Sequence, residues 1–414
     1  NNDEIKFISC SPTSELNYVK KFAYKYKNKE KLINISSKAE EFYKEQNLEV
    51  LDQSIAPHED AIYLHSGGTT GKSKIIALSA YAINSVVTNA FFFADEEAGY
   101  GIGILACLPM FHGFGLTMCI HLMLSHGGTL ILMPKFSRRD AVHYIAKNQM
   151  HYLLGVPVLY EALLSKRNFK GKKLRYLREA FVGGDYVSPA LTERYNRRMI
   201  EGGSNCRLRE GYGLTEAVNV CTVNTFRTNK DGTVGKLLPN IHAIILDKNL
   251  NELGFNQDGE ICIGGPTIMN GYRFQDKEDN SVFYYGKDGI KYVRTGDFGS
   301  IDSDGYVTFK SRLKQLVKVN GVPVFPSMIE DCATSFDFVY ETCAIGVEDD
   351  KHGHIIKLYV MLSKTYKGTK IDAEKKIVNE IVSKLGVYSK PKEIIFIDKM
   401  PHTPLGKIYY KLLH

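Results

Sequence analysis

Short apolar runs alternate with helix-length amphipathic segments between residue 60 and about residue 220. The runs have the length of buried strands, and the segments between them repeat apolar positions at helical spacing. The expected strands cover residues 61–65, 102–108, 129–133, 152–156, 179–182 and 207–211, and the expected helices include 80–94, 138–148 and 189–200. This alternation predicts a large, layered α/β domain.

Turn-forming residues become more frequent after this region, which predicts a more antiparallel part of the chain. Its expected strands cover residues 241–247, 259–263, 291–294 and 306–310. A second pattern begins after Lys314, with expected helices over 326–335 and 372–385 and expected strands over 340–347, 355–362 and 393–397. That length is near the lower limit for a unit that folds alone. We therefore expect a large domain over residues 1–312 and a small α+β domain over residues 313–414.

Residues 99–134 contain no Asp, Glu, Lys or Arg, so a membrane-spanning helix has to be considered. Pro109, several glycines and three histidines interrupt the stretch. A buried strand, a short helix over 114–124 and a second strand explain it better. The first residues, Asn-Asn-Asp-Glu, do not resemble a signal peptide. We expect no transmembrane segment.

Composition narrows the classes further. The chain has 414 residues, 44% of them hydrophobic and 24% charged, which is typical of a globular protein. A net charge of +7 over this length is mild, so it weakly favours a phosphate-bearing small molecule and does not indicate nucleic acid. The eight cysteines form no C-x-x-C pair, which predicts neither a zinc site nor disulfides and favours a reducing, cytoplasmic location.

Glycines, hydroxyls and lysines are concentrated in the segment from His65 to Lys74, HSGGTTGKSK. Backbone N–H groups, hydroxyls and ammonium groups at this density suit a phosphate. The pattern is one residue short of a P-loop, because three residues separate Gly67 from Gly71 where a P-loop has four. The rest of the chain therefore has to identify the phosphate chemistry.

Three further segments carry candidate chemistry at expected strand ends. Thr215 and Glu216 place a hydroxyl that could bond a phosphate beside a carboxylate that could hold Mg²⁺. Asp297, after a glycine, suits the two hydroxyls of a ribose, and Gly183-Gly184-Asp185 lets a flat ring approach the backbone. Taken singly, Thr215-Glu216 is better explained as an ordinary strand end, and the Asp297 and Gly183-Gly184-Asp185 segments can equally be plain turns.

Together with LPMFHGFG, SRLKQLVKVNG and PHTPLGKI, these segments occur in one order across residues 60–414. This arrangement resembles the superfamily of adenylate-forming enzymes, which comprises acyl- and aryl-CoA synthetases, adenylation domains of peptide synthetases and firefly luciferase. The resemblance implies the adenylate-forming fold with a small mobile C-terminal domain. It also implies that ATP activates a carboxylic acid as an acyl-adenylate, after which a thiol takes the acyl group and AMP leaves.

The resemblance also implies roles for individual residues. The phosphate loop corresponds to Ser66, Gly67, Gly68, Thr69, Thr70, Gly71 and Lys74, and the adenine and acyl walls to Gly183, Gly184, Asp185, Gly211, Tyr212 and Gly213. Thr215 matches a phosphate-contacting threonine and Glu216 the Mg²⁺ ligand. Asp297 and Arg312 match the ribose-binding pair, and His112 lies beside the substrate carboxylate.

Three positions belong to the mobile small domain in this resemblance. Lys407 resembles the catalytic lysine that bridges the substrate carboxylate and the α-phosphate. Lys314 resembles the hinge, and Gly321 lies in the loop past which pantetheine enters the site. Ser73 departs from the family, which has proline there. Only about 65 residues precede the loop, fewer than the family has, so an N-terminally shortened domain is expected.

The acceptor and the acid remain open at this point. The motifs LPMFHGFGL and EGYGLTE are most similar to those of fatty-acyl-CoA synthetases, so CoA is the expected acceptor. A fatty or aryl acid is the expected substrate. One alternative is a ligase that loads the phosphopantetheine of an acyl carrier protein. An alternative of another class is a degenerate adenylation fold that acts as a binding scaffold. The intact set of candidate residues argues against the scaffold.

Overall fold

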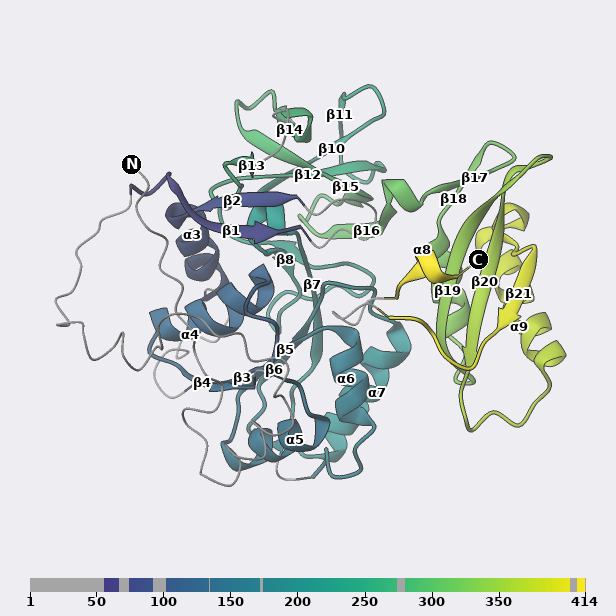
Figure 1. Ribbon diagram of the computed structural model, residues 1–414, viewed down its shortest axis with the longest axis horizontal. Coiled ribbons are helices and arrows are strands. Elements are labelled where there is room, and N and C mark those ends of the chain that lie inside the picture. The colour runs from purple at the N-terminus through teal and green to yellow at the C-terminus, as the bar shows by residue number, and fades with distance from the viewer. Residues whose placement is uncertain are drawn as a thin grey trace, which may run out of the picture. The chain divides into compact units, whose positions relative to one another are not determined.

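The computed structural model describes residues 56–66, 74–91, 102–133, 135–171, 174–273, 280–402 and 408–413. These residues fall within one compact unit, Ala56–His414. Helices and strands are labelled as in Figure 1.

A seven-stranded sheet in the order β4-β3-β5-β6-β7-β8-β9 forms the centre of the large domain. Its strands are β3 (Gly103–Ala106), β4 (Thr129–Leu132), β5 (Tyr152–Gly155), β6 (Glu179–Val182), β7 (Leu208–Gly213), β8 (Val220–Val223) and β9 (Lys236–Leu237). The pairs from β4 to β7 are parallel, and β8 and β9 add antiparallel pairs. The carboxyl ends of the parallel strands therefore lie at one edge of the sheet.

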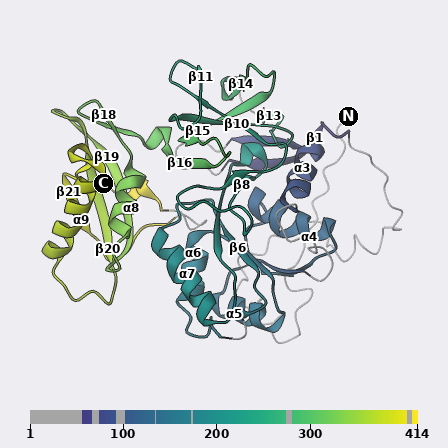
Figure 2. The ribbon, with the colours of Figure 1, turned by 180° about the vertical axis from the view of Figure 1, so that it is seen from behind.

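Alternating residues of these strands contribute to two different cores, because successive side chains of a strand point to opposite faces. Ile104 and Leu154 pack with α3, η1 and α4, whereas Leu105 and Leu153 pack with α5, α6 and α7. Figure 2 shows α5, α6 and α7 together beside the strands. The helices are α3 (Ala80–Phe91), η1 (Phe114–His121), α4 (Leu122–Ser125), α5 (Arg138–Lys147), α6 (Pro157–Leu164) and α7 (Pro189–Glu201).

Two antiparallel sheets complete the large domain. One has the order β1-β2-β13, with β1 (Asp60–His65), β2 (Ile75–Ser79) and β13 (Gly271–Arg273). The other has the order β11-β10-β12-β15-β14, with β16 also paired to β15. Its strands are β10 (His242–Leu246), β11 (Glu252–Leu253), β12 (Gly259–Gly264), β14 (Phe283–Tyr285), β15 (Lys291–Ile301) and β16 (Val307–Arg312). Two short 3₁₀ turns of the large domain are η3 (Thr215–Ala217) and η4 (Asn280–Val282).

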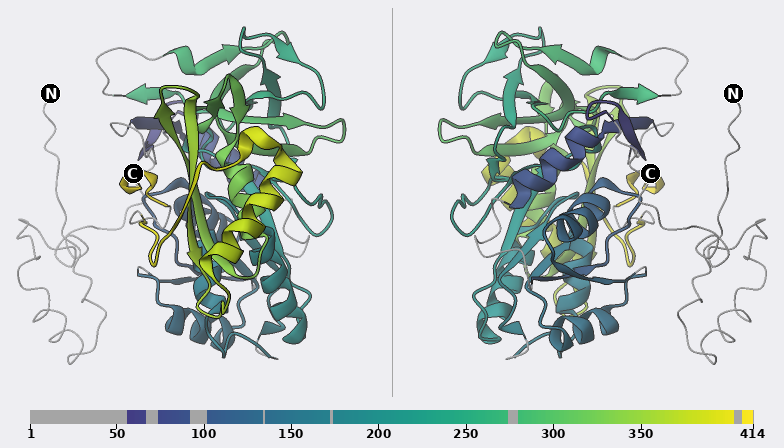
Figure 3. Two further views of the ribbon diagram at one scale, coloured as in Figure 1. Left: turned by 90° about the vertical axis from the view of Figure 1, so that its right-hand side faces the viewer. Right: turned by 90° about the vertical axis from the view of Figure 1, so that its left-hand side faces the viewer.

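The small domain is a five-stranded sheet covered by two helices. The sheet consists of β17 (Val317–Val319), β18 (Val322–Val324), β19 (Val339–Asp349), β20 (Gly353–Leu362) and β21 (Glu393–Phe396). The two helices are α8 (Pro326–Thr334) and α9 (Lys370–Leu385). Short 3₁₀ turns lie at η5 (Leu313–Gln315), η6 (Val387–Ser389) and η7 (Tyr410–Leu412). Ile329 of α8 and Ile377 of α9 pack on Leu358 of β20. Figure 3 shows α9, in yellow-green, along this sheet. Thr369 caps α9 by accepting a hydrogen bond from the Asp372 N–H group.

The predicted class, a large layered α/β domain followed by a small α+β domain, is confirmed. The helix expected over 114–124 is present but begins as a π-helix, η1, before α4. The pattern did not predict β2, α6, β8 or β13. The seven described cysteines are free. No helix among the described residues combines the length and apolar character needed to cross a bilayer.

Candidate functional site

A cavity of about 1690 Å³ opens at the carboxyl ends of β5, β6 and β7. Open α/β sheets bind ligands at this edge. The candidate residues that line the cavity are Ser66, Lys74, His112, Gly183, Gly184, Asp185, Gly211, Tyr212, Gly213, Thr215, Glu216, Asp297, Arg312 and Lys314. The structure thus brings together side chains that are up to about 250 residues apart in sequence, and the role of each remains a prediction.

Glycines form one wall of this cavity because the backbones there are too close for side chains. A Cβ on Gly183 would lie 2.6 Å from the carbonyl oxygen of Gly211. A Cβ on Gly213 would lie 1.5 Å from the carbonyl oxygen of Asn219, on the turn into β8. Gly184 has a φ of +78°, which favours glycine. At these positions the backbone carries no side chains, and its contact with an adenine ring remains a prediction.

We expect the Gly213→Ala substitution to destabilise the large domain by about 3 kcal/mol or more, because the new methyl group overlaps backbone that cannot move freely. The measurement is the free energy of unfolding in urea. Gly254→Ala is the matched control, since the atom nearest to its Cβ is a side-chain nitrogen of Gln257 at 3.8 Å. Equal stability of the two variants would contradict the packing described here.

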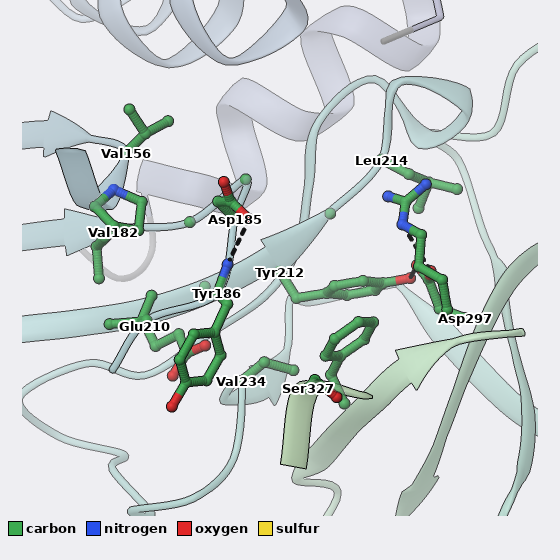
Figure 4. A pocket seen from close by; sticks show the side chains of 18 of the residues that line it. Val156, Val182, Asp185, Tyr186, Glu210, Tyr212, Leu214, Val234, Asp297 and Ser327 are labelled. Carbon is green, nitrogen blue, oxygen red and sulfur yellow. Dashed lines mark hydrogen bonds and ion pairs between the residues drawn. The ribbon is translucent and has the colours of Figure 1, made fainter. Parts of the chain in front are cut away.

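Asp297 is the most deeply buried charged group of the site, with 2% of its surface exposed. The Tyr212 hydroxyl donates to its Oδ2 at 2.7 Å, and Nε of Arg312 lies 3.4 Å from its Oδ1 (Figure 4). Burial and the charge of Asp297 raise the pKa of Tyr212 well above its usual value, so the hydroxyl stays a donor. A buried carboxylate beside an arginine can accept hydrogen bonds from two neighbouring hydroxyls, as a ribose presents.

A bulge in β15 presents Asp297 to the cavity. Strand β12 advances two residues, from Glu260 to Cys262, while its partner β15 advances four, from Arg294 to Phe298. Gly296 in the bulge has a φ of +70°. Glu260 accepts from both Arg294, at 2.7 Å, and the Gly296 N–H group, at 3.1 Å. This partly buried ion pair fixes the bulge, and nothing in the local sequence pattern predicted it.

Thr215 and Glu216 form the short turn η3 directly after β7. Thr215 is buried, and the carboxylate of Glu216 accepts a hydrogen bond from the Tyr272 hydroxyl at 3.1 Å. Among the described residues, no three His, Cys, Asp or Glu side chains gather as a metal cage. One carboxylate next to a hydroxyl fits Mg²⁺ all the same, because Mg²⁺ commonly binds through one or two carboxylates and the substrate phosphates.

The predicted phosphate loop connects β1 and β2, and the structure describes the residues at its two ends, Ser66 and Lys74. The Ser66 N–H donates to the carbonyl oxygen of Lys74 at 2.8 Å, and the Lys74 N–H donates to the Ser66 hydroxyl at 3.0 Å. The Lys74 ammonium lies 4.2 Å from the centre of the Tyr272 ring. Gly67, Gly68, Thr69, Thr70 and Gly71 lie outside the described residues.

One arm of the cavity is apolar. Ile104 of β3, Leu154 of β5 and Phe181 of β6 line it together with Phe114 and Met118 of η1, and all five belong to or pack against one hydrophobic cluster. Phe114 also donates its backbone N–H to Nδ1 of His112 at 3.2 Å. Residues of the short helix over 114–124 therefore contribute to both the core and the cavity.

Partly buried carboxyl groups line another wall, and the pKa values of three of them are raised. Burial, with a contribution from the nearby charge of Asp331, raises the pKa of Glu210 to about 8. Burial likewise raises the pKa of Glu330 to about 8 and that of Asp331 to about 6. Figure 4 shows Glu210 beside Tyr186. This wall consequently repels a polyphosphate less than its number of carboxyl groups suggests.

Of the three residues expected to act from the small domain, one is among the residues that line the cavity. Lys314, in η5, lines it. Gly321 has a φ of +80° between β17 and β18, which favours glycine, but it is not among the lining residues. Lys407 lies outside the described residues, and the bridge between His402 and Ile408 spans its segment.

Comparison with known proteins gives two profile matches. The profile described as "AMP-binding enzyme" matches residues 8–273, and that described as "AMP-binding enzyme C-terminal domain" matches residues 328–407. The first match alone covers more than half of the chain.

Individual relatives agree with the profiles. The Humulus lupulus protein named "Probable CoA ligase CCL5" is 30% identical over 92% of this chain and 68% of its own length. A "Long-chain-fatty-acid–CoA ligase" of Bacillus subtilis is 29% identical over 86% of this chain and 61% of its own length. The chain therefore spans about two thirds of the length of such relatives.

A solved structure shows the same fold. The ATP-bound MatB of Rhodopseudomonas palustris has a TM-score of 0.78 and 26% identity, covering 87% of this chain and 68% of that one.

Proposed function

Because this chain belongs to the AMP-binding enzyme family, we propose that it activates a carboxylic acid with ATP and passes the acyl group to CoA. The observation that carries the proposal is the single cavity that holds Asp297 with Tyr212 and Arg312 at one place and Thr215, Glu216 and Lys74 at another. These are binding groups for a ribose and for phosphates. The names of the relatives, two CoA ligases, and the ATP bound to MatB support the same activity.

In the first step, a carboxylate oxygen of the acid forms a bond to the α-phosphorus of ATP, and the bond to pyrophosphate breaks. Two anions must meet, so the site has to supply cations and donors that are already in place. Asp297 and Arg312 hold the ribose, Thr215 bonds a phosphate oxygen, and the loop from Ser66 to Lys74 holds the β- and γ-phosphates. Lys407 bridges the two reacting anions.

Glu216 is the residue that would hold Mg²⁺, together with the phosphate oxygens of ATP. The ion supplies charge neutralisation when it is bound. The chain's own contribution is the fixed position of the Glu216 carboxylate on η3, beside the Thr215 hydroxyl.

The acid carries a single carboxylate and is otherwise uncharged and apolar, as in a fatty or aryl acid. The arm formed by Ile104, Leu154, Phe181, Phe114 and Met118 offers only apolar and aromatic side chains to the part of the substrate beyond its carboxyl group. A second charge there would lose its hydration without gaining a partner. His112 lines the same cavity and accepts the Phe114 N–H, and it is the residue that we expect beside the substrate carboxylate.

We expect Ile104→Phe to lower kcat/KM for long acyl chains about tenfold relative to short ones, because the larger ring narrows the arm. Ile104→Val is the matched control and should keep the wild-type order of preference. A series of straight-chain acids of increasing length measures the effect. An identical loss for every chain length would contradict the assignment of the arm.

In the second step, a thiolate forms a bond to the acyl carbon and AMP leaves with the electron pair of the broken bond. CoA is the proposed acceptor, and the phosphopantetheine of a carrier protein is the alternative with the same chemistry. Rotation of a small domain over residues 313–414 about Lys314 would bring Gly321 to the thiol path. The free thiols of the described cysteines are typical of a reducing compartment, so we place the reaction in the cytoplasm.

Product analysis tests this function. The protein is incubated with ATP, Mg²⁺, CoA and a panel of fatty, aryl and dicarboxylic acids, and the nucleotides and thioesters are separated and identified by mass. AMP and an acyl-CoA are the expected products. ADP as the nucleotide product would overturn the proposal, and AMP without any acyl-CoA would favour the carrier protein. Unchanged ATP with every acid would favour the scaffold alternative.

A further inference from the structure

Tyr272 contacts both charged groups that the proposed site directs at the phosphates. Its ring centre lies 4.2 Å from the Lys74 ammonium, and its hydroxyl donates to Oε1 of Glu216 at 3.1 Å. The ring also lines the cavity. One side chain thus joins the base of the phosphate loop to the candidate metal ligand, although these two groups lie on different elements.

The segment that carries Tyr272 is anchored on both sides. Arg273 binds Asp60 through Nε, at 2.8 Å, and through its second terminal nitrogen, at 3.0 Å. The side-chain amide of Asn270 donates to the same carboxylate at 2.7 Å. The Met269 N–H donates to the backbone carbonyl of Glu216 at 2.9 Å. The backbone around the ring is therefore held against both β1 and η3.

Each contact of Tyr272 restricts one charged side chain without neutralising it. The face of an aromatic ring attracts an ammonium group and leaves its N–H donors available. A carboxylate has about four acceptor positions, so one hydrogen bond orients Glu216 and leaves others for a metal. Partners that orient a metal ligand in this way commonly change metal affinity 10- to 100-fold when they are removed.

We propose that Tyr272 is a positioning residue that sets the Glu216 carboxylate for Mg²⁺ through its hydroxyl and the Lys74 ammonium for the phosphates through its ring. This inference rests on the proposed function. It assigns a separate task to each half of one side chain, so two substitutions can separate them. Tyr272→Phe removes the hydrogen bond and keeps the ring, whereas Tyr272→Leu removes both.

Metal binding is measured without turnover, by electron paramagnetic resonance of Mn²⁺ with a non-hydrolysable ATP analogue. We expect Tyr272→Phe to weaken Mn²⁺ binding about tenfold. In the exchange of pyrophosphate into ATP, the same variant should need about tenfold more Mg²⁺ for half-maximal rate and regain a near wild-type kcat at saturation. Its KM for the acid should not change. Tyr272→Leu should in addition raise the KM for ATP.

The matched control is Tyr284→Phe, because the Tyr284 hydroxyl donates to Glu252 at 3.3 Å outside the cavity. It should bind Mn²⁺ like the wild type, and melting temperatures confirm that all variants fold. Wild-type Mn²⁺ affinity in Tyr272→Phe would overturn the inference and leave the proposed function intact. If Tyr272→Phe weakened Mn²⁺ binding but the wild-type protein turned over no acid, the positioning role would be supported and the proposed function would be contradicted.

Discussion

Replacement of Lys407 by alanine should lower the rate of acyl-adenylate formation by about 1000-fold while sparing thioester formation from a supplied acyl-adenylate. The ammonium group is expected to lie between the substrate carboxylate and the α-phosphate, where its loss restores the repulsion between two anions. Stabilisation of developing charge by a fixed group is commonly worth 100- to 1000-fold or more. In the second half-reaction the new bond forms at the acyl carbon and the carboxylate no longer attacks the α-phosphorus, so the bridge that Lys407 provides between these two groups is not needed.

The two half-reactions are measured separately, the first by pyrophosphate exchange and the second by adding CoA to synthetic acyl-adenylate. Lys399→Ala is the matched control, because it removes an exposed lysine of the same C-terminal segment. We expect it to leave both rates unchanged. Equal loss of both half-reactions in Lys407→Ala would show that the lysine has another role.

Asp297→Asn should raise the KM for ATP about 10- to 100-fold with a smaller effect on the KM for the acid. The substitution removes the charge and one acceptor from a group that is 98% buried, and hydrogen bonds to charged groups are worth about 1.5–3 kcal/mol. A factor of ten corresponds to about 1.4 kcal/mol. The amide still has an oxygen to accept the Tyr212 hydroxyl, so the fold should tolerate it.

Asp302→Asn provides the comparison for this variant. Asp302 lies in the turn that follows β15, binds Lys230 at 2.6 Å and is not among the residues that line the cavity. It should therefore leave the KM for ATP unchanged. If Asp297→Asn raised the KM values for the acid and for ATP equally, a general distortion of the site would explain it better than loss of a ribose contact.

The sequence predicted those parts of the site that carry their chemistry within one short segment. The glycines at 183, 211 and 213 line the cavity, and close backbone packing of this kind leaves a local signature of glycine at strand ends. Thr215 and Glu216 are adjacent in the chain, so their common position on η3 follows from the strand before them. The expected strand over residues 179–182 matches β6 at both ends.

Contacts between distant segments could not be predicted in this way. Tyr272 reaches Glu216 across 56 residues, and Glu260 reaches Arg294 across 34. Strand β13 has three residues and pairs with β2, the strand after the predicted phosphate loop. Neither strand shows enough alternation of apolar and polar residues to be recognised from the sequence alone. The apolar arm posed the same difficulty, since an apolar run such as the one that contains Phe114 and Met118 is more often plain core than part of a cavity.

Acid-dependent exchange of labelled pyrophosphate into ATP tests the central claim most directly, because it reports reversible formation of an acyl-adenylate without any thiol. The wild-type protein should catalyse exchange with at least one neutral fatty or aryl acid, more weakly or not at all with dicarboxylic acids, and only when Mg²⁺ is present. Lys407→Ala should lose this exchange. A wild-type protein that binds ATP but shows no exchange with any acid of the panel would contradict the account.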